Sequence, residues 1–310
     1  MSTVIDEYLH GVKSNLRLEA PDEAEVIREL ATHIEDEVRE LKDDGLRDEE
    51  AISTCIRVLG SAKSVGRKIY EAHSQGTWRQ ALLTSLPHLL FASLFILNWW
   101  RGLIPVLILL IAVMSTAVYG WWHRRSGWLF PWIGYSLLPV IIAGLSLLYL
   151  PSGLTWIAVI VYFPLAVWLL IRVITQTIKK DWLYLSLMLL PMPAIVGWFI
   201  STGWMGNFDL GTEERLYNNA PWIGISFLAL AFGVVTFVRI RRRWLKIAVL
   251  FMSGAIALTL ISSYARGRLD FTVLLLLILL LVSIFLVPAL LENGVKTGRW
   301  GKYFEHRPMS

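Results

Sequence analysis

Long runs of apolar residues fill most of this chain after residue 80. A helix that crosses a bilayer needs about 20 mostly apolar residues. Eight stretches fit that length: 81–99, 102–122, 128–150, 154–174, 182–204, 222–238, 245–264 and 271–291. They predict an all-α protein whose residues 77–292 form a polytopic membrane bundle of about eight transmembrane helices, with a basic tail at 293–310. With 55% hydrophobic and only 17% charged residues, the chain is neither a soluble globular enzyme nor a disordered chain.

The fifth stretch is the least regular of the eight, because Pro191 and Pro193 stand at its centre. Neighbouring helices can satisfy the backbone groups that a proline frees inside a membrane. We therefore expect a kink there and not the end of the helix.

Basic residues set the expected orientation of the bundle. If the N-terminus lies inside, the inner loops and the tail carry 14 Lys and Arg and the outer loops carry four. The positive-inside rule therefore places both termini in the cytoplasm, in a multi-pass protein of the inner membrane. Tryptophans at both expected interfaces agree with this orientation. The only sizeable outer connection is predicted at 205–221, where a solvated connector is favoured over a ligand-binding loop.

Residues 1–76 have a different character, because residues 1–79 hold 17 of the 24 acidic side chains and 11 of the 29 basic ones, a net charge of −6. Ile27, Leu30, Ile34, Val38 and Leu41 recur at helical spacing and predict an amphipathic helix. Glycines at 45 and 60 are expected to end the second and third helices, acids at 48–50 to begin the third, and the serine at 61 to cap a fourth. The pattern predicts a small cytoplasmic four-helix domain.

Four short segments of this domain share a recognisable pattern: IDEYL at 5–9, ELATHIEDE at 29–37, GLRDEEA at 45–51 and LGSAK at 59–63. In these segments the region resembles the HAAS-type helical signalling domain of bacteria, also known as a permease prefix domain. Arg47 stands where family members usually have a capping serine, and Ser61-Ala62 stands where they have Asp-Pro. The membrane segment is matched to no family.

The resemblance implies a signalling or regulatory module and names no reaction. Such domains precede diverse membrane segments and are often associated with winged-helix repressors of the PadR type. It therefore implies a cytoplasmic regulatory protein as a partner, besides the lipid bilayer, and no direct contact with nucleic acid.

A dense basic cluster lies between the sixth and seventh apolar stretches: Arg239, Arg241, Arg242, Arg243 and Lys246. One interpretation is topology and contact with anionic lipid, at about 1 kcal/mol for each residue. The other follows from the opposite charges of the two regions: the acidic domain docks on this cluster and is released by a signal. Candidate acids lie in the second predicted helix, at Glu29, Asp36 and Glu37.

Residues that carry chemistry are scarce. His88 is the one titratable group of interest inside an apolar stretch, and we expect a neutral imidazole hydrogen-bonded to a neighbouring helix. His33 lies among carboxylates, where an exposed side chain is favoured over a metal ligand. The single cysteine, Cys55, is expected to pack in the domain core. Hydrolase, metalloprotease and nucleotide-binding motifs do not occur, so we expect no enzyme, no cofactor and no metal.

Two functions fit these observations. The first is a membrane signalling or regulatory protein whose acidic cytoplasmic domain binds a partner or docks on the basic inner face. The second is a permease or transport subunit with a regulatory prefix domain. A polar cavity at mid-depth would favour transport, and the sequence identifies no ligand and no oligomeric state.

Overall fold

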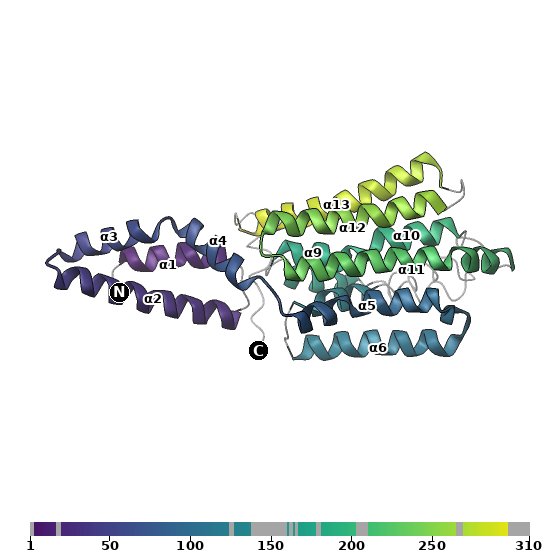
Figure 1. The fold of residues 1–310 in the computed structure, drawn as a ribbon, viewed down its shortest axis with the longest axis horizontal. Helices are drawn as coiled ribbons and strands as arrows, with labels where there is room; N and C mark the ends of the chain where they lie inside the picture. Colours follow the sequence, from purple (N-terminus) through teal and green to yellow (C-terminus); the bar gives the residue numbers. More distant parts are fainter. Residues whose placement is uncertain are drawn as a thin grey trace. The chain divides into compact units, whose positions relative to one another are not determined.

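A computed structural model describes residues 3–16, 20–123, 127–137, 160, 164, 167–177, 181–202, 210–264 and 269–296. Over these residues it contains twelve helices with defined bounds, further helical residues at 129–137 and 167–177, and no strand (Figure 1), which confirms the all-α prediction. The chain divides into two compact units. The N-terminal unit comprises Met1–Gly76 together with Ile240–Arg243, and the membrane unit comprises Thr77–Arg239 together with Trp244–Ser310.

The N-terminal unit contains four helices: α1 (Thr3–Leu16), α2 (Ala20–Asp43), α3 (Asp48–Leu59) and α4 (Ala62–His73). Their apolar stripes meet in one core, where Val12, Leu16, Ile34, Ala51 and Cys55 are at most 1% exposed. This inward stripe with polar outer faces is how a small water-soluble helical unit is stabilised.

Local signals determine where these helices begin and end. Gly45 and Gly60 have φ values of 98° and 89°, a backbone region that favours glycine. The hydroxyl of Ser61 accepts a hydrogen bond from the Ser64 N–H and caps α4. The Tyr8 hydroxyl donates to the Gly60 carbonyl at 2.9 Å and ties α1 to the α3–α4 turn. The predicted glycine ends and serine cap are therefore confirmed.

The membrane unit begins with α5 (Trp78–Ile96), the 3-10 helix η1 (Trp99–Arg101) and α6 (Leu103–Trp122). Residues 129–137 and 167–177 are also helical. Then follow α9 (Trp182–Leu189), α10 (Pro191–Ser201), α11 (Leu210–Arg239), α12 (Arg243–Tyr264) and α13 (Phe271–Lys296). Most of the predicted third stretch and the first half of the fourth lie outside the described residues.

Five helical stretches of the described chain are long and apolar enough to cross a membrane: Leu103–Trp122, Trp182–Ser201, Glu213–Arg239, Arg243–Tyr264 and Phe271–Glu292. They indicate a membrane protein. The stretch at 182–201 includes both α9 and α10, and the intervening Leu190 keeps helical backbone angles. The helical path therefore continues through Pro191, as expected, with α9 and α10 divided at Leu190; the kink itself stays a prediction.

Helix α11 begins earlier than predicted. Residues 210–221 were expected to belong to an outer connection, but they form the first three turns of α11, with Pro221 inside the helix. Glu213 lies in the first turn, where the positive end of the helix dipole stabilises an acid. The Gly- and Asn-rich composition that indicated a loop is thus overridden by helix-terminal charge and by packing.

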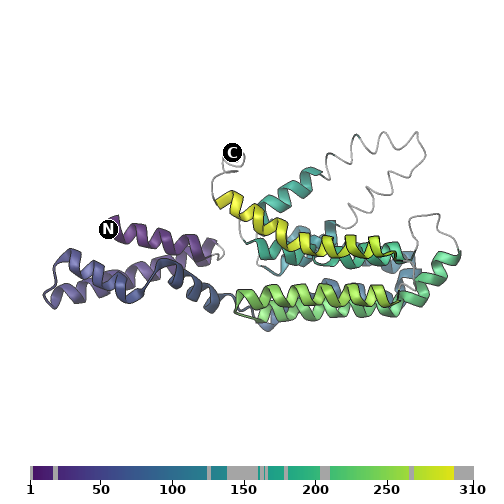
Figure 2. The ribbon, with the colours of Figure 1, turned by 90° about the horizontal axis from the view of Figure 1, so that it is seen from above.

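The pair α5 and α11 forms the most extensive helix interface among the described elements (Figure 1). A Cβ atom at Gly224 would overlap Ile96 and lie 3.1 Å from the Ala92 carbonyl oxygen, so glycine permits this close approach. Helix α13 packs along α9 and α10 (Figure 2). The Ser186 hydroxyl donates to the Ile284 carbonyl at 2.8 Å and fixes the register of α9 on α13.

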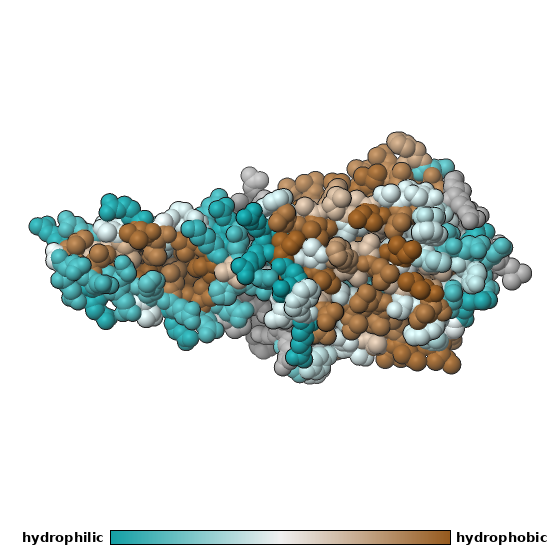
Figure 3. Space-filling model, viewed as in Figure 1, coloured by the Kyte–Doolittle hydropathy of each residue, from teal (hydrophilic) through white to brown (hydrophobic). Residues whose placement is uncertain are grey.

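Much of the face of the membrane unit that Figure 3 shows is apolar. On α6, Leu103, Ile104, Ile108 and Ile111 are 63–73% exposed, and on α13 the exposed side chains include Phe271 at 79%. A water-soluble protein rarely exposes apolar patches of this extent. Such surfaces are stable when they face lipid.

Candidate functional site

The segment Ile240–Arg243, between α11 and α12, packs on the end of α4 within the N-terminal unit. The Ser74 hydroxyl donates to the Arg241 carbonyl at 3.1 Å, and Arg241 Nε donates to Gln75 Oε1 at 2.7 Å. The guanidinium of Arg243 lies over the Tyr70 ring, 5.9 Å from its centroid. We call this set of contacts the α4–loop joint.

The end of α4 presents these partners for a local reason. Helix α4 stops at His73, and the Ser74 N–H still donates to the Tyr70 carbonyl at 2.7 Å. Ser74 and Gln75 are therefore held beside the last turn. Thr77 then starts α5 with a capping box, in which its hydroxyl and the Gln80 side chain each accept a backbone N–H. Two residues, Gln75 and Gly76, connect the two caps.

The five residues of the predicted basic cluster differ in their surroundings. Arg241 and Arg242 are exposed, and Arg243 is partly buried in the α4–loop joint. Arg239 lies over the Trp78 ring at 4.5 Å, in the membrane unit. Lys246 is 1% exposed, with Nζ 5.0 Å from the centroid of the Phe237 ring. Lys246 therefore does not contribute to an exposed basic surface.

The predicted acidic residues lie on α2. Asp36 pairs with Arg39 at 3.6 Å within the same helix, and among the described residues Glu29 and Glu37 make no ion pair. The α4–loop joint instead uses a side-chain amide, a carbonyl and an aromatic ring. Attraction between these acids and the arginines stays a prediction.

Cys55 and Tyr8 lie in the core of the N-terminal unit. Burial, and secondly the Glu37 carboxylate, raises the pKa of the Cys55 thiol. Burial, and secondly Cys55, raises the pKa of the Tyr8 hydroxyl. Both groups are thus held neutral, which suits a packed core residue and not a thiolate nucleophile.

His33 is exposed on α2, and the described residues contain no group of three or more potential metal ligands. The exposed-side-chain interpretation of His33 fits this position. The absence of a metal or a cofactor from the protein stays an expectation.

His88 is fully buried in the membrane unit, and its environment differs from the expected one. Neither ring nitrogen has a hydrogen-bond partner within the described structure, and the same holds for the buried hydroxyl of Tyr135. The two rings meet edge-on, with centroids 5.2 Å apart. Phe91 stacks on Tyr135 at 4.3 Å. The expected hydrogen bond to a neighbouring helix is thus not found among the described residues. There His88 lies in an aromatic cluster that links α5, residues 129–137 and α11.

Sequence reasoning missed three buried ionisable residues of the membrane unit. Asp181 is 1% exposed and caps α9 by accepting the Leu183 N–H at 3.1 Å, while Lys246 and Glu292 are 1% and 4% exposed. Helical spacing could have indicated the burial of two of them. Lys246 lies on the same face of α12 as the buried residues 250, 253, 257 and 261, and Glu292 lies on the same face of α13 as the buried residues 277, 281, 284 and 288. From their positions near helix ends, solvent exposure is expected for all three side chains.

The chain matches no protein-family model, no curated protein and no solved structure. The likeness of residues 1–76 to the HAAS-type domain therefore depends on the four segments quoted above. Evidence for function comes from the α4–loop joint and from the two units that the chain connects.

Proposed function

We propose that this protein is a membrane signalling or regulatory protein whose N-terminal unit binds a cytoplasmic partner and transmits its binding state to the membrane helices. In this proposal residues 1–76 are a HAAS-like domain. The chain crosses the inner membrane eight times with both termini in the cytoplasm, and it has no enzymatic activity.

The single observation that carries the proposal is the α4–loop joint. The chain passes between the two units at three places, after residues 76, 239 and 243. Residues that precede the first crossing point, Tyr70, Ser74 and Gln75, contact the segment 240–243 that lies between the other two. A shift of α4 on partner binding therefore acts on both α5 and the α11–α12 connection.

The contacts of the joint are individually weak, which suits a reversible switch. An exposed hydrogen bond contributes about 1 kcal/mol, and an exposed cation–π contact about 0.5–1 kcal/mol. A partner that prefers one state of α4 by about 2 kcal/mol would change the equilibrium between the closed and open joint by about thirtyfold.

The exposed acids of α2 are the proposed contact surface for the partner. Glu29 and Asp36 are exposed, and like charges on one protein favour a basic partner surface through electrostatic steering. The HAAS-like pattern adds the expectation that the partner is a winged-helix repressor.

Affinity capture from native membranes tests this proposal. The full-length protein is compared with a variant that lacks residues 1–76, after equal membrane insertion has been verified. A second comparison neutralises the α2 acids in full-length protein, as Glu29→Gln, Asp36→Asn and Glu37→Gln. Its matched control makes the same charge change on α1 and α3, as Asp6→Asn, Glu7→Gln and Glu49→Gln.

The proposal predicts a cytoplasmic protein that is retained by the full-length chain and by the α1/α3 control. That protein is lost from the truncated chain and reduced by the α2 variant. Retention of the same proteins by all four chains would contradict a partner-binding N-terminal unit. A nucleotide-binding subunit that still co-purifies with the truncated chain would instead support the permease alternative. No observation on the described residues favours that alternative.

A further inference from the structure

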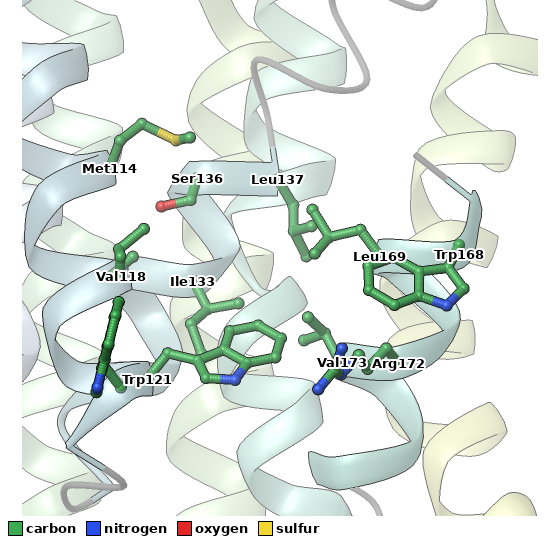
Figure 4. Close-up of a pocket in the computed structure, with 12 residues that line it drawn as sticks. Met114, Val118, Trp121, Ile133, Ser136, Leu137, Trp168, Leu169, Arg172 and Val173 are labelled. Atoms are coloured by element: carbon green, nitrogen blue, oxygen red, sulfur yellow. The ribbon is translucent and has the colours of Figure 1, made fainter. Parts of the chain in front are cut away.

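A pocket of about 430 Å³ opens in the membrane unit between α6 and the helical residues 167–177. Figure 4 shows Met114, Val118 and Trp121 of α6 on one side and residues 168, 169, 172 and 173 on the other. Residues 133, 136 and 137 lie between them. The volume falls in the range of about 300–1,000 Å³ that is typical of ligand pockets.

The lining is apolar apart from two side chains, Ser136 and Arg172. The Ser136 hydroxyl donates to the Trp132 carbonyl at 3.0 Å, so its hydrogen is already used. Arg172 lies over the Trp168 ring at 5.1 Å, and no carboxylate of the described residues pairs with it. Among the described residues, the pocket therefore combines an apolar wall with one cation that no carboxylate neutralises.

The pocket opens on the surface that faces lipid. Its lining residues Val118, Trp122 and Trp168 are 57%, 82% and 52% exposed. Trp122 is the last residue of α6, and tryptophans concentrate at the headgroup level of a membrane. Arg172 is thus positioned at headgroup depth, and the apolar wall extends from it towards the bilayer centre.

We propose that this pocket binds one anionic phospholipid, with its phosphate on Arg172 and one acyl chain along α6 between Val118 and Met114. A guanidinium recognises phosphate through charge-assisted hydrogen bonds, and the apolar wall provides the free energy of burying a chain. A soluble anion would leave the apolar wall uncovered, and a zwitterionic lipid would bring its own cation beside Arg172 and weaken the attraction to its phosphate. The source of the phosphate is therefore a membrane lipid.

Native mass spectrometry of the full-length protein in detergent tests the site. The protein is titrated with phosphatidylglycerol, with phosphatidylcholine of the same acyl chains, or with inorganic phosphate. Arg172→Gln removes the cation, and Val118→Trp fills the chain-binding wall while keeping the cation. Arg79→Gln is the matched control, because it removes an equal charge from an exposed position outside the pocket.

We expect one phosphatidylglycerol to be retained about fivefold more strongly than phosphatidylcholine, the scale of one basic side chain at an anionic surface. Arg172→Gln should abolish this preference. Val118→Trp should lower retention of both lipids, Arg79→Gln should behave as the natural chain, and inorganic phosphate should not compete. Equal retention of the two lipids by the natural chain, an unchanged preference in Arg172→Gln, or displacement by inorganic phosphate would overturn the proposal. Unchanged elution in size-exclusion chromatography verifies that each variant is folded.

Discussion

The two units of this chain are both helical, but they differ in which side chains they bury and which they expose. In the N-terminal unit Val12, Leu16 and Ile34 are fully buried and the charged residues lie outside. In the membrane unit large apolar side chains cover the exterior, while His88, Lys246 and Glu292 are buried. Water around one unit and lipid around the other explain the inversion. Exposure of a side chain therefore has a meaning only when the surrounding solvent is known.

The largest expected effect is the difference between the same substitution at two similarly exposed residues, one in each unit. Ile111 of α6 is 63% exposed and Val58 of α3 is 75% exposed. Ile111→Asp should cost about 3 kcal/mol, because an acid near the centre of a membrane helix opposes insertion. Val58→Asp should change stability by less than about 0.5 kcal/mol, as at an ordinary water-exposed position.

Alkaline extraction of membranes measures this difference as the fraction of chain that stays inserted. We expect a large loss for Ile111→Asp and none for Val58→Asp. Equal behaviour of the two variants would show that both units face the same solvent.

A smaller effect tests how tightly the membrane unit is packed. A Cβ atom at Gly134 would overlap the backbone carbonyl of Met188, whereas a Cβ at Gly197 would meet the tip of Ile261 at 2.9 Å. Backbone cannot move aside as a side-chain tip can, so Gly134→Ala should cost about 2 kcal/mol and Gly197→Ala less than about 1 kcal/mol. Thermal unfolding in detergent should show a fall of about 6 °C for the first and about 2 °C or less for the second. Equal falls would contradict the described approach of Gly134 to α9.

The smallest effect concerns pH and is confined to the N-terminal unit. The pKa of Cys55 is raised above its ordinary value of 9.0 by burial. The folded unit keeps the thiol proton after the unfolded chain has lost it, so this contribution is complete below about pH 9 and declines as pH rises towards the raised pKa. In Cys55→Ala the loss of stability between pH 8 and 10 should be smaller than in the natural chain.

Hydrogen exchange of α1 and α3 amides, corrected for the intrinsic pH dependence, measures that loss. Part of the decline should persist in Cys55→Ala, because Tyr8 also has a raised pKa. An identical decline in both chains would exclude a role for the thiol.

The sequence predicted the parts of the fold that depend on local signals. Gly45, Gly60 and Ser61 specify helix ends through backbone angle and capping, and each acts as predicted. The start of α11 was missed, because loop-like composition at 210–221 is overridden by charge at the helix end and by packing. The number of membrane crossings stays a prediction beyond the five stretches that the described residues show.

The candidate site was less predictable for a physical reason. The basic cluster was recognised by its charge, but its partners Tyr70, Ser74 and Gln75 carry no charge and lie about 170 residues away along the chain, where sequence spacing gives no information on contact. The burial of Lys246 could have been predicted from its place on the α12 stripe. The unpartnered nitrogens of His88 could not, because they depend on how three helical segments pack.

The most direct test of the account is hydrogen exchange in α4 of the full-length protein in lipid nanodiscs. Arg241→Ala combined with Arg243→Ala removes the side-chain contacts of the α4–loop joint, and Arg242→Ala is the matched control, since its exposed side chain makes none of these contacts. The account predicts exchange about 5–30-fold faster in the last turns of α4 for the double variant, equivalent to about 1–2 kcal/mol, and a change of less than about twofold for the control. Unchanged protection of α4 in the double variant, or an equal increase in Arg242→Ala, would contradict the α4–loop joint.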